Sequence, residues 1–390
     1  MFYELLWLLL PVAAASGWIA AGRGVRKAPT ITSPPAVRSD YFRGLNYLLN
    51  EQPDKAIEVF IRVLEVDSET VETHLALGNL FRRRGEVDRA IRIHQNLIAR
   101  PTLSNQERGD ALLELGQDYM RAGLLDRAEG LFQELVRVQP FGGQALQHLV
   151  DIYQQEKDWD KAAEAARQLE QLSGKPYGGV ISHFFCEQAE EKSREGDLPG
   201  ALRTVQRALD VSSQCVRASM LEGSLLERLG DFRGAVRAYK RVEQQDADYT
   251  PEVIEPLSRC FEALDRPVDM EEYLAYLLER YGGISSALAL AELKAVREGR
   301  DAAVRFLTEQ LRRRPSVKGL DRLIHMSLAE VDGTARDYLM ILKDLTHKLL
   351  ENRPVYKCDH CGFSGRSLHW QCPSCKLWGR IKPIQGVEGE

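Results

Sequence analysis

"LGNLFRRRGEVDRAIRIHQNLIARP", residues 77–101, contains a spaced set of four residues that recurs along the chain. The set is Gly78, an aromatic residue three positions later, Ala90, and the bulky His94 four positions after that alanine. Segments 43–67 and 115–140 contain the same set; the first glycine is residue 44, 78 or 116, so the intervals are 34 and 38 residues. Small and bulky residues at such fixed spacing are typical of paired helices that pack closely. The recurrence predicts a series of equivalent helix pairs.

The pattern continues with less regular residues through the middle of the chain. The six sets are Gly44/Tyr47/Ala56/Phe60, Gly78/Phe81/Ala90/His94, Gly116/Tyr119/Ala128/Phe132, Val150/Tyr153/Ala162/Ala166, Ala189/Lys192/Ala201/Val205 and Gly223/Leu226/Ala235/Tyr239. Beyond Thr250 the register degrades, although 251–282 and 286–315 still have the pattern of helix pairs. A last helical stretch is predicted from Val317 to Asn352.

The repeated set resembles the tetratricopeptide repeat, which has a period of about 34 residues. This resemblance implies an all-α superhelical solenoid over residues 38–352, with turns at Gly85 and Gly230 where φ is positive. The first helix of each pair would line a concave groove suited to a protein partner. The expected inward positions are Glu72, Leu75, Asn79, Arg82, Asp110, Leu113, Gln117, Met120, Gln144, Gln147, Asp151 and Gln154. They lack the lysine and asparagine pattern that clamps a peptide carboxylate in some members of this repeat family.

The N-terminal segment predicts a transmembrane anchor over residues 1–22 followed by a linker over 23–37. Residues 2–21 contain one charged side chain, and about 20 helical residues span a bilayer core. A cleaved signal peptide is the alternative, but it would need positive charge before the apolar run. Here Arg23, Arg26 and Lys27 follow the run, which predicts a cytoplasmic position for the rest of the chain.

Composition and motifs argue against nucleic-acid binding and against catalysis. The formal charge is −5, whereas nucleic-acid binders are normally basic. The chain has no phosphate loop, serine-hydrolase elbow or zinc-protease motif, so we predict that it is not an enzyme. We interpret His183 as a packed helix residue, and Cys186, Cys215 and Cys260 as buried small residues inside helices.

Four further cysteines lie near the C-terminus in "KCDHCGFSGRSLHWQCPSCK", residues 357–376. Cys358, Cys361, Cys372 and Cys375 form two C-x-x-C pairs separated by ten residues, a spacing that places four thiolates around one metal ion. Iron and zinc both accept such a site. The pairs resemble rubredoxin knuckles, although the insert is shorter and Lys376 occupies a position where rubredoxins usually have glycine. We therefore predict a rubredoxin-like metal-binding module over residues 353–390.

Basic and aromatic residues surround this cluster. Lys357, Arg366, Lys376, Arg380 and Lys382 either offset the charge of the metal site or face an acidic partner. A module of this size needs metal or a neighbouring domain in order to fold. We expect Phe363, Trp370 and Trp378 to pack it against the C-terminal end of the solenoid as a structural clasp.

The order of anchor, repeats and terminal module resembles the lipopolysaccharide assembly protein B family (LapB) of Gram-negative bacteria. The resemblance covers essentially the whole chain, and "CPSCKLW" with "IKPI" is its most specific part. It implies a single-pass protein of the cell inner membrane that regulates lipopolysaccharide biosynthesis. Such an adaptor promotes degradation of the lipid A deacetylase LpxC by the membrane protease FtsH. A lipopolysaccharide-sensing inner-membrane protein and other lipopolysaccharide assembly proteins are the further implied partners.

Two other classes of function stay open at this stage. A rubredoxin-type iron would suit an electron-transfer protein, for which the chain offers no second redox site. A zinc ribbon with a basic tail would suit a nucleic-acid binder, which the overall acidity opposes. The sequence also permits a homo-oligomer.

Overall fold

A computed structural model describes residues 35–50, 52–66, 70–329, 331–351, 353–387 and 389–390. The chain divides into two compact units, Met1–Phe141 and Gly142–Glu390, each of which has its own core. The predicted anchor and most of the predicted linker lie outside the described residues. Within the described ranges, no helix combines the length and apolar character needed to cross a bilayer.

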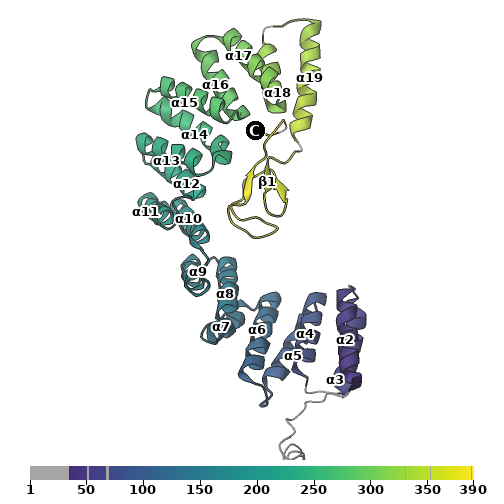
Figure 1. The fold of residues 1–390 in the computed structure, drawn as a ribbon. Coiled ribbons are helices and arrows are strands. Elements are labelled where there is room, and N and C mark those ends of the chain that lie inside the picture. The colour runs from purple at the N-terminus through teal and green to yellow at the C-terminus, as the bar shows by residue number, and fades with distance from the viewer. Residues whose placement is uncertain (1–34, 51, 67–69, 330, 352, 388) are drawn as a thin grey trace, which may run out of the picture. The chain divides into compact units, whose positions relative to one another are not determined.

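The described chain of both units is built almost entirely from antiparallel helix pairs (Figure 1). The helices of the first unit are α2 (Pro35–Leu49), α3 (Pro53–Val66), α4 (Val71–Arg84), α5 (Val87–Ile98), α6 (Asn105–Ala122) and α7 (Leu125–Leu135). The second unit contains α8 (Gly142–Glu156), α9 (Trp159–Ser173), α10 (Gly178–Glu195), α11 (Leu198–Val211), α12 (Val216–Arg228), α13 (Phe232–Gln245), the short η2 (Ala247–Tyr249), α14 (Thr250–Ala263), α15 (Pro267–Arg280), α16 (Ile284–Arg297), α17 (Arg300–Arg313), α18 (Val317–Ser327) and α19 (Thr334–Glu351). The predicted helical solenoid is confirmed.

The recurring sequence set works through complementary sizes inside each helix pair. A Cβ added to Gly78 would lie 2.3 Å from His94 Nε2, and one added to Gly116 would lie 2.6 Å from the Phe132 ring. Where the first helix carries the larger Val150, the second carries Ala166, and both are buried. A small residue on one helix of a pair thus faces a larger residue on the other, and which helix carries the larger one varies. Close-packed interiors require such complementary sizes.

The turns between paired helices confirm the predicted role of glycine. Gly85 follows α4 with φ of 84°, and Gly230 follows α12 with φ of 83°. Side chains other than glycine are strained in this left-handed region. The backbone N–H of the turn glycine donates to a carbonyl of the preceding helix, as Gly85 N does to Arg82 O at 3.0 Å.

Two boundaries differ from the sequence analysis. Helix α2 already begins at Pro35, a residue that fits the first turn of a helix. The single stretch predicted from Val317 to Asn352 was wrong: it is two helices, α18 and α19, separated by a turn in which Gly333 has φ of 68°. Helix-forming residues on both sides of this turn concealed it.

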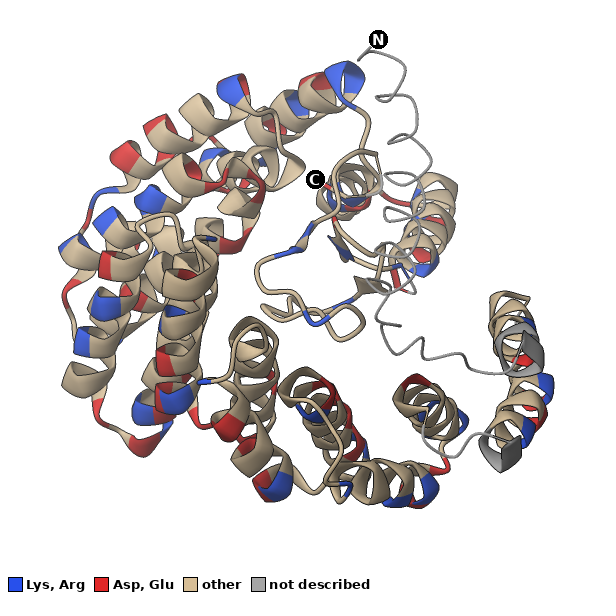
Figure 2. Ribbon diagram, turned by 60° about the horizontal axis from the view of Figure 1, so that its bottom comes forward, with Lys and Arg blue, Asp and Glu red and all other residues tan. Residues whose placement is uncertain are grey.

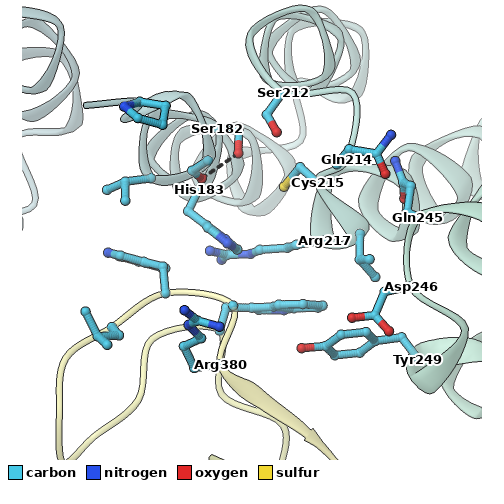
Figure 3. Close-up of a pocket in the computed structure, with 18 residues that line it drawn as sticks. Ser182, His183, Ser212, Gln214, Cys215, Arg217, Gln245, Asp246, Tyr249 and Arg380 are labelled. Carbon is cyan, nitrogen blue, oxygen red and sulfur yellow. Dashed lines mark hydrogen bonds between the residues drawn. The ribbon is translucent and has the colours of Figure 1, made fainter. Parts of the chain in front are cut away.

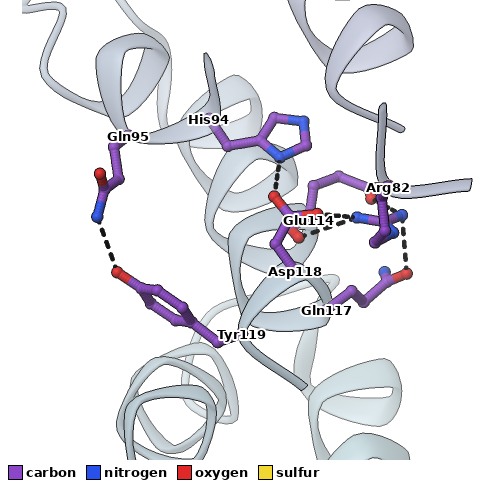
Figure 4. A network of polar contacts seen from close by, with 7 residues as sticks. All are labelled: Arg82, His94, Gln95, Glu114, Gln117, Asp118 and Tyr119. Carbon is purple, nitrogen blue, oxygen red and sulfur yellow. Dashed lines mark hydrogen bonds and ion pairs between the residues drawn. The ribbon is translucent and has the colours of Figure 1, made fainter. Parts of the chain in front are cut away.

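A buried polar network links the second and third helix pairs of the first unit (Figure 4). His94 Nδ1 lies 2.5 Å from Asp118 Oδ2, and neither side chain is exposed. Arg82 donates to the other Asp118 oxygen at 2.7 Å and to Glu114 at 2.6 Å. Arg82, predicted to face the groove, therefore joins one repeat to the next. Elsewhere, charges of both signs are interspersed along the helices (Figure 2).

The C-terminal module contains a small antiparallel sheet. Its strands are β1 (Tyr356–Cys358), β2 (Ser364–Gly365) and β3 (Ile381–Pro383), in the order β2-β1-β3. Tyr356 pairs with Gly365 on one side and with Pro383 on the other. The sheet thereby brings the first cysteine pair close to the chain that leaves the second.

Candidate metal centre and its docking face

The four predicted ligands converge on one point. Their sulfur atoms all lie within 4.8 Å of one another. Cys358 Sγ is 3.8 Å from Cys375 Sγ, and Cys361 Sγ is 3.6 Å from Cys372 Sγ. Sulfurs bound tetrahedrally at about 2.3 Å from one ion would lie about 3.8 Å apart. These residues form a four-cysteine metal-binding site whose geometry fits zinc and iron alike.

The two knuckles are near-copies of each other, offset by fourteen residues along the sequence. In the first, Cys358 N donates to Phe363 O at 2.7 Å; in the second, Cys372 N donates to Leu377 O at 2.9 Å. Gly362 follows the first knuckle with φ of 78°, and Lys376 follows the second with φ of 60°. Lys376 thus adopts the left-handed conformation that explains why glycine is usual at this position.

The site is buried on one side only. Cys358 and Cys372 are inaccessible, Cys375 is half-buried and Cys361 is exposed. Ile381 of β3 packs with the two buried cysteines, and Phe363 also packs there. The module therefore has a very small apolar core. Modules of this size normally need a metal ion or a neighbouring domain in order to fold.

Trp378 provides the main aromatic contact between module and repeats. Its ring stacks on His183 of α10 at 5.1 Å between centroids and meets Phe184 and Trp159 edge-on at 5.9 and 6.5 Å. Its Nε1–H donates to Gln154 Oε1 of α8 at 2.8 Å. This half-buried tryptophan thus packs its ring against aromatic neighbours and has its N–H donor satisfied.

Trp370 makes the second aromatic contact. It stacks on Tyr249 of η2 with centroids 5.5 Å apart. The guanidinium carbon of Arg217 from α12 lies about 6 Å from both tryptophan rings, within the range of cation–π attraction. Arg217 is 3% exposed and donates to Glu187 and Glu190 at 2.8 Å, so its charge is compensated.

Polar contacts fix the register of the module on the repeats. Tyr249 donates its hydroxyl to Ile381 O at 2.7 Å. Lys382 Nζ lies 2.7 Å from Asp246 and 3.0 Å from Asp248. Tyr356 donates to Glu252 of α14 at 2.9 Å. Hereafter the docking face means Gln154, Trp159, His183, Arg217, Asp246, Tyr249 and Glu252.

The last residues extend the attachment to α16 and α18. Glu390 accepts from Ser285 Oγ at 2.8 Å and from Lys318 Nζ at 2.9 Å. Val317 N at the start of α18 donates to Val387 O at 2.9 Å. The terminal tail of the module therefore contacts the C-terminal repeats.

The expected position of the module was partly wrong. Trp370 and Trp378 do pack on the solenoid, but on the inner side of the curve that α8 to α18 make rather than over its end (Figure 1). Phe363 packs inside the module instead. Gln154, predicted to line a groove for a partner, binds the chain's own tryptophan. Lys382 pairs with two aspartates of the repeats, so its ion pairs are within the chain.

His183 is more than a packed helix residue, because it carries the aromatic stack of the docking face. Burial, and to a smaller extent the charge of the nearby Arg217, lowers the pKa of His183 to about 3. The imidazole is therefore neutral at physiological pH. Figure 3 shows it beside Arg217, which reaches from α12 toward the module.

A cavity of about 460 Å³ opens beside this stack and is lined by repeat and module residues together. Cys215 lies in its wall (Figure 3). The prediction that Cys215 is inside a helix was wrong: it is the N-cap residue of α12, whereas Cys186 and Cys260 are helical and buried. Hydrogen bonds from Cys186, Ser182 and the Ala218 amide lower the Cys215 pKa to about 6.

Two kinds of family model match the two parts of this architecture. The family described as rubredoxin metal binding domain matches residues 356–383. Tetratricopeptide repeat families match residues 73–108, 113–176 and 186–250. A solved C-terminal part of a repeat protein from Cytophaga hutchinsonii superposes with TM-score 0.39 at 12% identity, covering 68% of this chain and 98% of that one.

Two curated relatives match over almost the whole length. Lipopolysaccharide assembly protein B of Escherichia coli K12 is 39% identical over 387 residues, covering 99% of each chain. The protein of the same name from Haemophilus influenzae is 36% identical over 395 residues, again covering 99% of each. By this likeness, and by the repeats and four-cysteine module that it spans, the chain belongs to the lipopolysaccharide assembly protein B family.

Proposed function

We propose that this protein is an inner-membrane adaptor that promotes degradation of the deacetylase LpxC by the protease FtsH. The observation that carries the proposal is the likeness over 99% of the chain to proteins named for lipopolysaccharide assembly. A helical repeat scaffold provides surface for partner proteins, which suits an adaptor. In this proposal the chain is not an enzyme.

The arrangement of the second unit supports a structural role for the metal. The module is held on the docking face by aromatic stacking, hydrogen bonds and the Lys382 ion pairs. We propose iron as the metal because the module matches a rubredoxin metal-binding family. Zinc would be a working substitute, since four thiolates accept both ions. An exposed ligand such as Cys361 also suits electron transfer, so that class remains the alternative to test.

The remaining proposals concern topology and partner surfaces. Residues 1–22 would anchor the chain, 23–37 would link it, and the bulk would lie in the cytoplasm because Arg23 and Arg26 follow the apolar run. Helix pairs 38–352 and the module 353–390 would meet the other lipopolysaccharide assembly proteins. Glu72 and the partly exposed Asn79 and Gln117 of the first unit offer polar groups for such contacts.

The test is a reconstituted degradation assay with FtsH and LpxC in lipid. Adding the full-length protein should accelerate loss of LpxC, and iron- and zinc-loaded forms should act equally. A rate that is unchanged by the protein would refute the adaptor proposal. A rate that follows reduction and oxidation of iron would favour the electron-transfer class.

A further inference from the structure

The last helix, α19, leaves an apolar stripe uncovered. Tyr338, Ile341, Leu342, Leu345 and Leu349 are 48–69% exposed, and they follow one another at intervals of three, one, three and four residues. This spacing places them on one face of the helix. A terminal helix of a repeat solenoid normally presents a polar outer face, and contiguous exposed apolar residues mark an interaction site.

The attachment of α19 to the repeats uses a different face. Thr346 is the buried residue of the helix, and its hydroxyl donates to Asp321 of α18 at 2.8 Å. Leu339 and Leu350, seven and four residues from Thr346, are only partly exposed and share its side of the helix. The stripe lies about 100° around the helix from this attached face, counting 100° per residue. It is therefore free to meet another surface while α19 stays attached.

Two charges beside the stripe indicate what that surface is. Asp337 and Lys348 are eleven residues apart, which is about three turns and about 16 Å, so they lie on the same flank at opposite ends of the stripe. Neither takes part in an ion pair among the described residues. An antiparallel second copy of α19 would set Asp337 against Lys348 twice by symmetry. In a parallel copy the flank that carries Asp337 and Lys348 would face the opposite flank of the partner helix, so the two residues could not pair with each other.

We propose that this chain forms a homodimer by antiparallel pairing of α19 with α19 of a second copy. A twofold axis near residues 343 and 344 places Tyr338 opposite Leu349 and Leu342 opposite Leu345. Such an isologous contact is the usual form of a symmetric dimer. The contact is small compared with stable interfaces, so the dimer is weak, and anchoring of both copies in one membrane would strengthen it.

A lipid surface fits the stripe less well than a second copy does. The six formal charges of α19 are Arg336, Asp337, Lys343, Asp344, Lys348 and Glu351, which cancel. A helix that lies on an anionic membrane normally has a surplus of lysine and arginine on its polar face. The balanced charges favour protein over lipid.

Charge exchange tests the pairing in full-length, metal-loaded protein in detergent. Analytical ultracentrifugation should show at least tenfold weaker self-association for Leu345→Asp. Asp337→Lys and Lys348→Asp should each weaken it, and the double variant should restore it. Met340→Asp is the matched control, because Met340 is 51% exposed but projects away from the stripe. Equal association of Leu345→Asp and the native protein would overturn the proposal, as would failure of the double variant to recover.

Cross-linking tests the direction. Under mild copper-phenanthroline oxidation, a mixture of Tyr338→Cys and Leu349→Cys proteins should form a heterodimeric disulfide, whereas Tyr338→Cys alone should not dimerise. Cross-linking of Tyr338→Cys to itself would instead show a parallel pair. In nanodiscs that hold one copy, a thiol at Leu345→Cys should stay open to alkylation. Protection there would show that lipid or another segment of the same chain covers the stripe, and would overturn the proposal.

Discussion

At the scale of single residues, the metal centre tolerates one side chain that its backbone disfavours. Lys376 and Gly362 occupy equivalent places after the two knuckles, and both have positive φ. A Cβ at Gly362 would meet nothing within 4 Å. A side chain at this place is therefore disfavoured by the backbone conformation and not by a clash with neighbouring atoms. An L-residue in this region costs about 1 kcal/mol.

Replacing Lys376 with glycine should therefore strengthen the module. Relief of about 1 kcal/mol corresponds to roughly fivefold slower release of metal to a chelator. The reciprocal Gly362→Ala variant should release metal faster by a similar factor. Faster release from Lys376→Gly would show that its side chain, rather than its backbone, matters to the site.

His183 makes the attachment of the module sensitive to pH. Its folded-state pKa is lowered to about 3, chiefly by burial and also by Arg217. Below about pH 6.5, the imidazole of the undocked state is protonated, whereas that of the docked state stays neutral. Docking is thus strongest above about pH 6.5 and weakens by about 1.4 kcal/mol for each pH unit below it.

Tryptophan fluorescence of Trp370 and Trp378 between pH 7.5 and 5.5 should report this loss, with metal content measured in parallel. His183→Phe keeps the ring but does not titrate, so its docking should change little over that range. An identical pH profile for both proteins would remove His183 from the explanation.

At the scale of elements, aromatic contacts outweigh ion pairs in holding the module on α8, α10 and η2. Trp378 contacts three aromatic rings and Gln154, whereas Lys382 is 29% exposed in its pairs with Asp246 and Asp248. Removing a well-packed tryptophan costs several kcal/mol. Partly exposed ion pairs contribute about 1 kcal/mol or less.

Limited proteolysis of metal-loaded protein should therefore separate the two contributions. Trp378→Ala should expose residues 353–390 to cleavage, with docking weakened by about 3 kcal/mol. Lys382→Ala should stay nearly as resistant as the native chain. If Lys382→Ala is the more sensitive variant, the electrostatic contacts dominate after all.

At the scale of the whole molecule, we expect the metal, the module and the second unit to depend on one another. Metal binding to a small thiolate site contributes on the order of 10 kcal/mol, enough to order a module with so small a core. The first unit has a core of its own around Leu80, Phe81 and Phe132. Loss of metal should affect the two units differently.

The variant Cys372→Ser should lose its metal, and hydrogen exchange should then rise in α8, α10, α12 and α14. Exchange in α4 to α7 should stay unchanged. Cys260→Ser, a buried thiol outside the metal site, is the control and should keep both metal and module. A metal-free protein with unchanged exchange in α10 and α12 would show that the module is not a clasp.

The sequence determined the repeats and the metal ligands, because both depend on local spacing. Gly78 with His94, or Cys358 with Cys361, act within one helix pair or one knuckle, where the period of the backbone sets the geometry. The position of the module, the neutral state of His183 and the burial of Arg217 were decided by tertiary structure alone. Trp378 meets Gln154 across 224 positions of the sequence, and no local pattern encodes such a contact. The same applies to the α18–α19 turn and to the stripe on α19, because exposure is a property of the neighbours that a helix has.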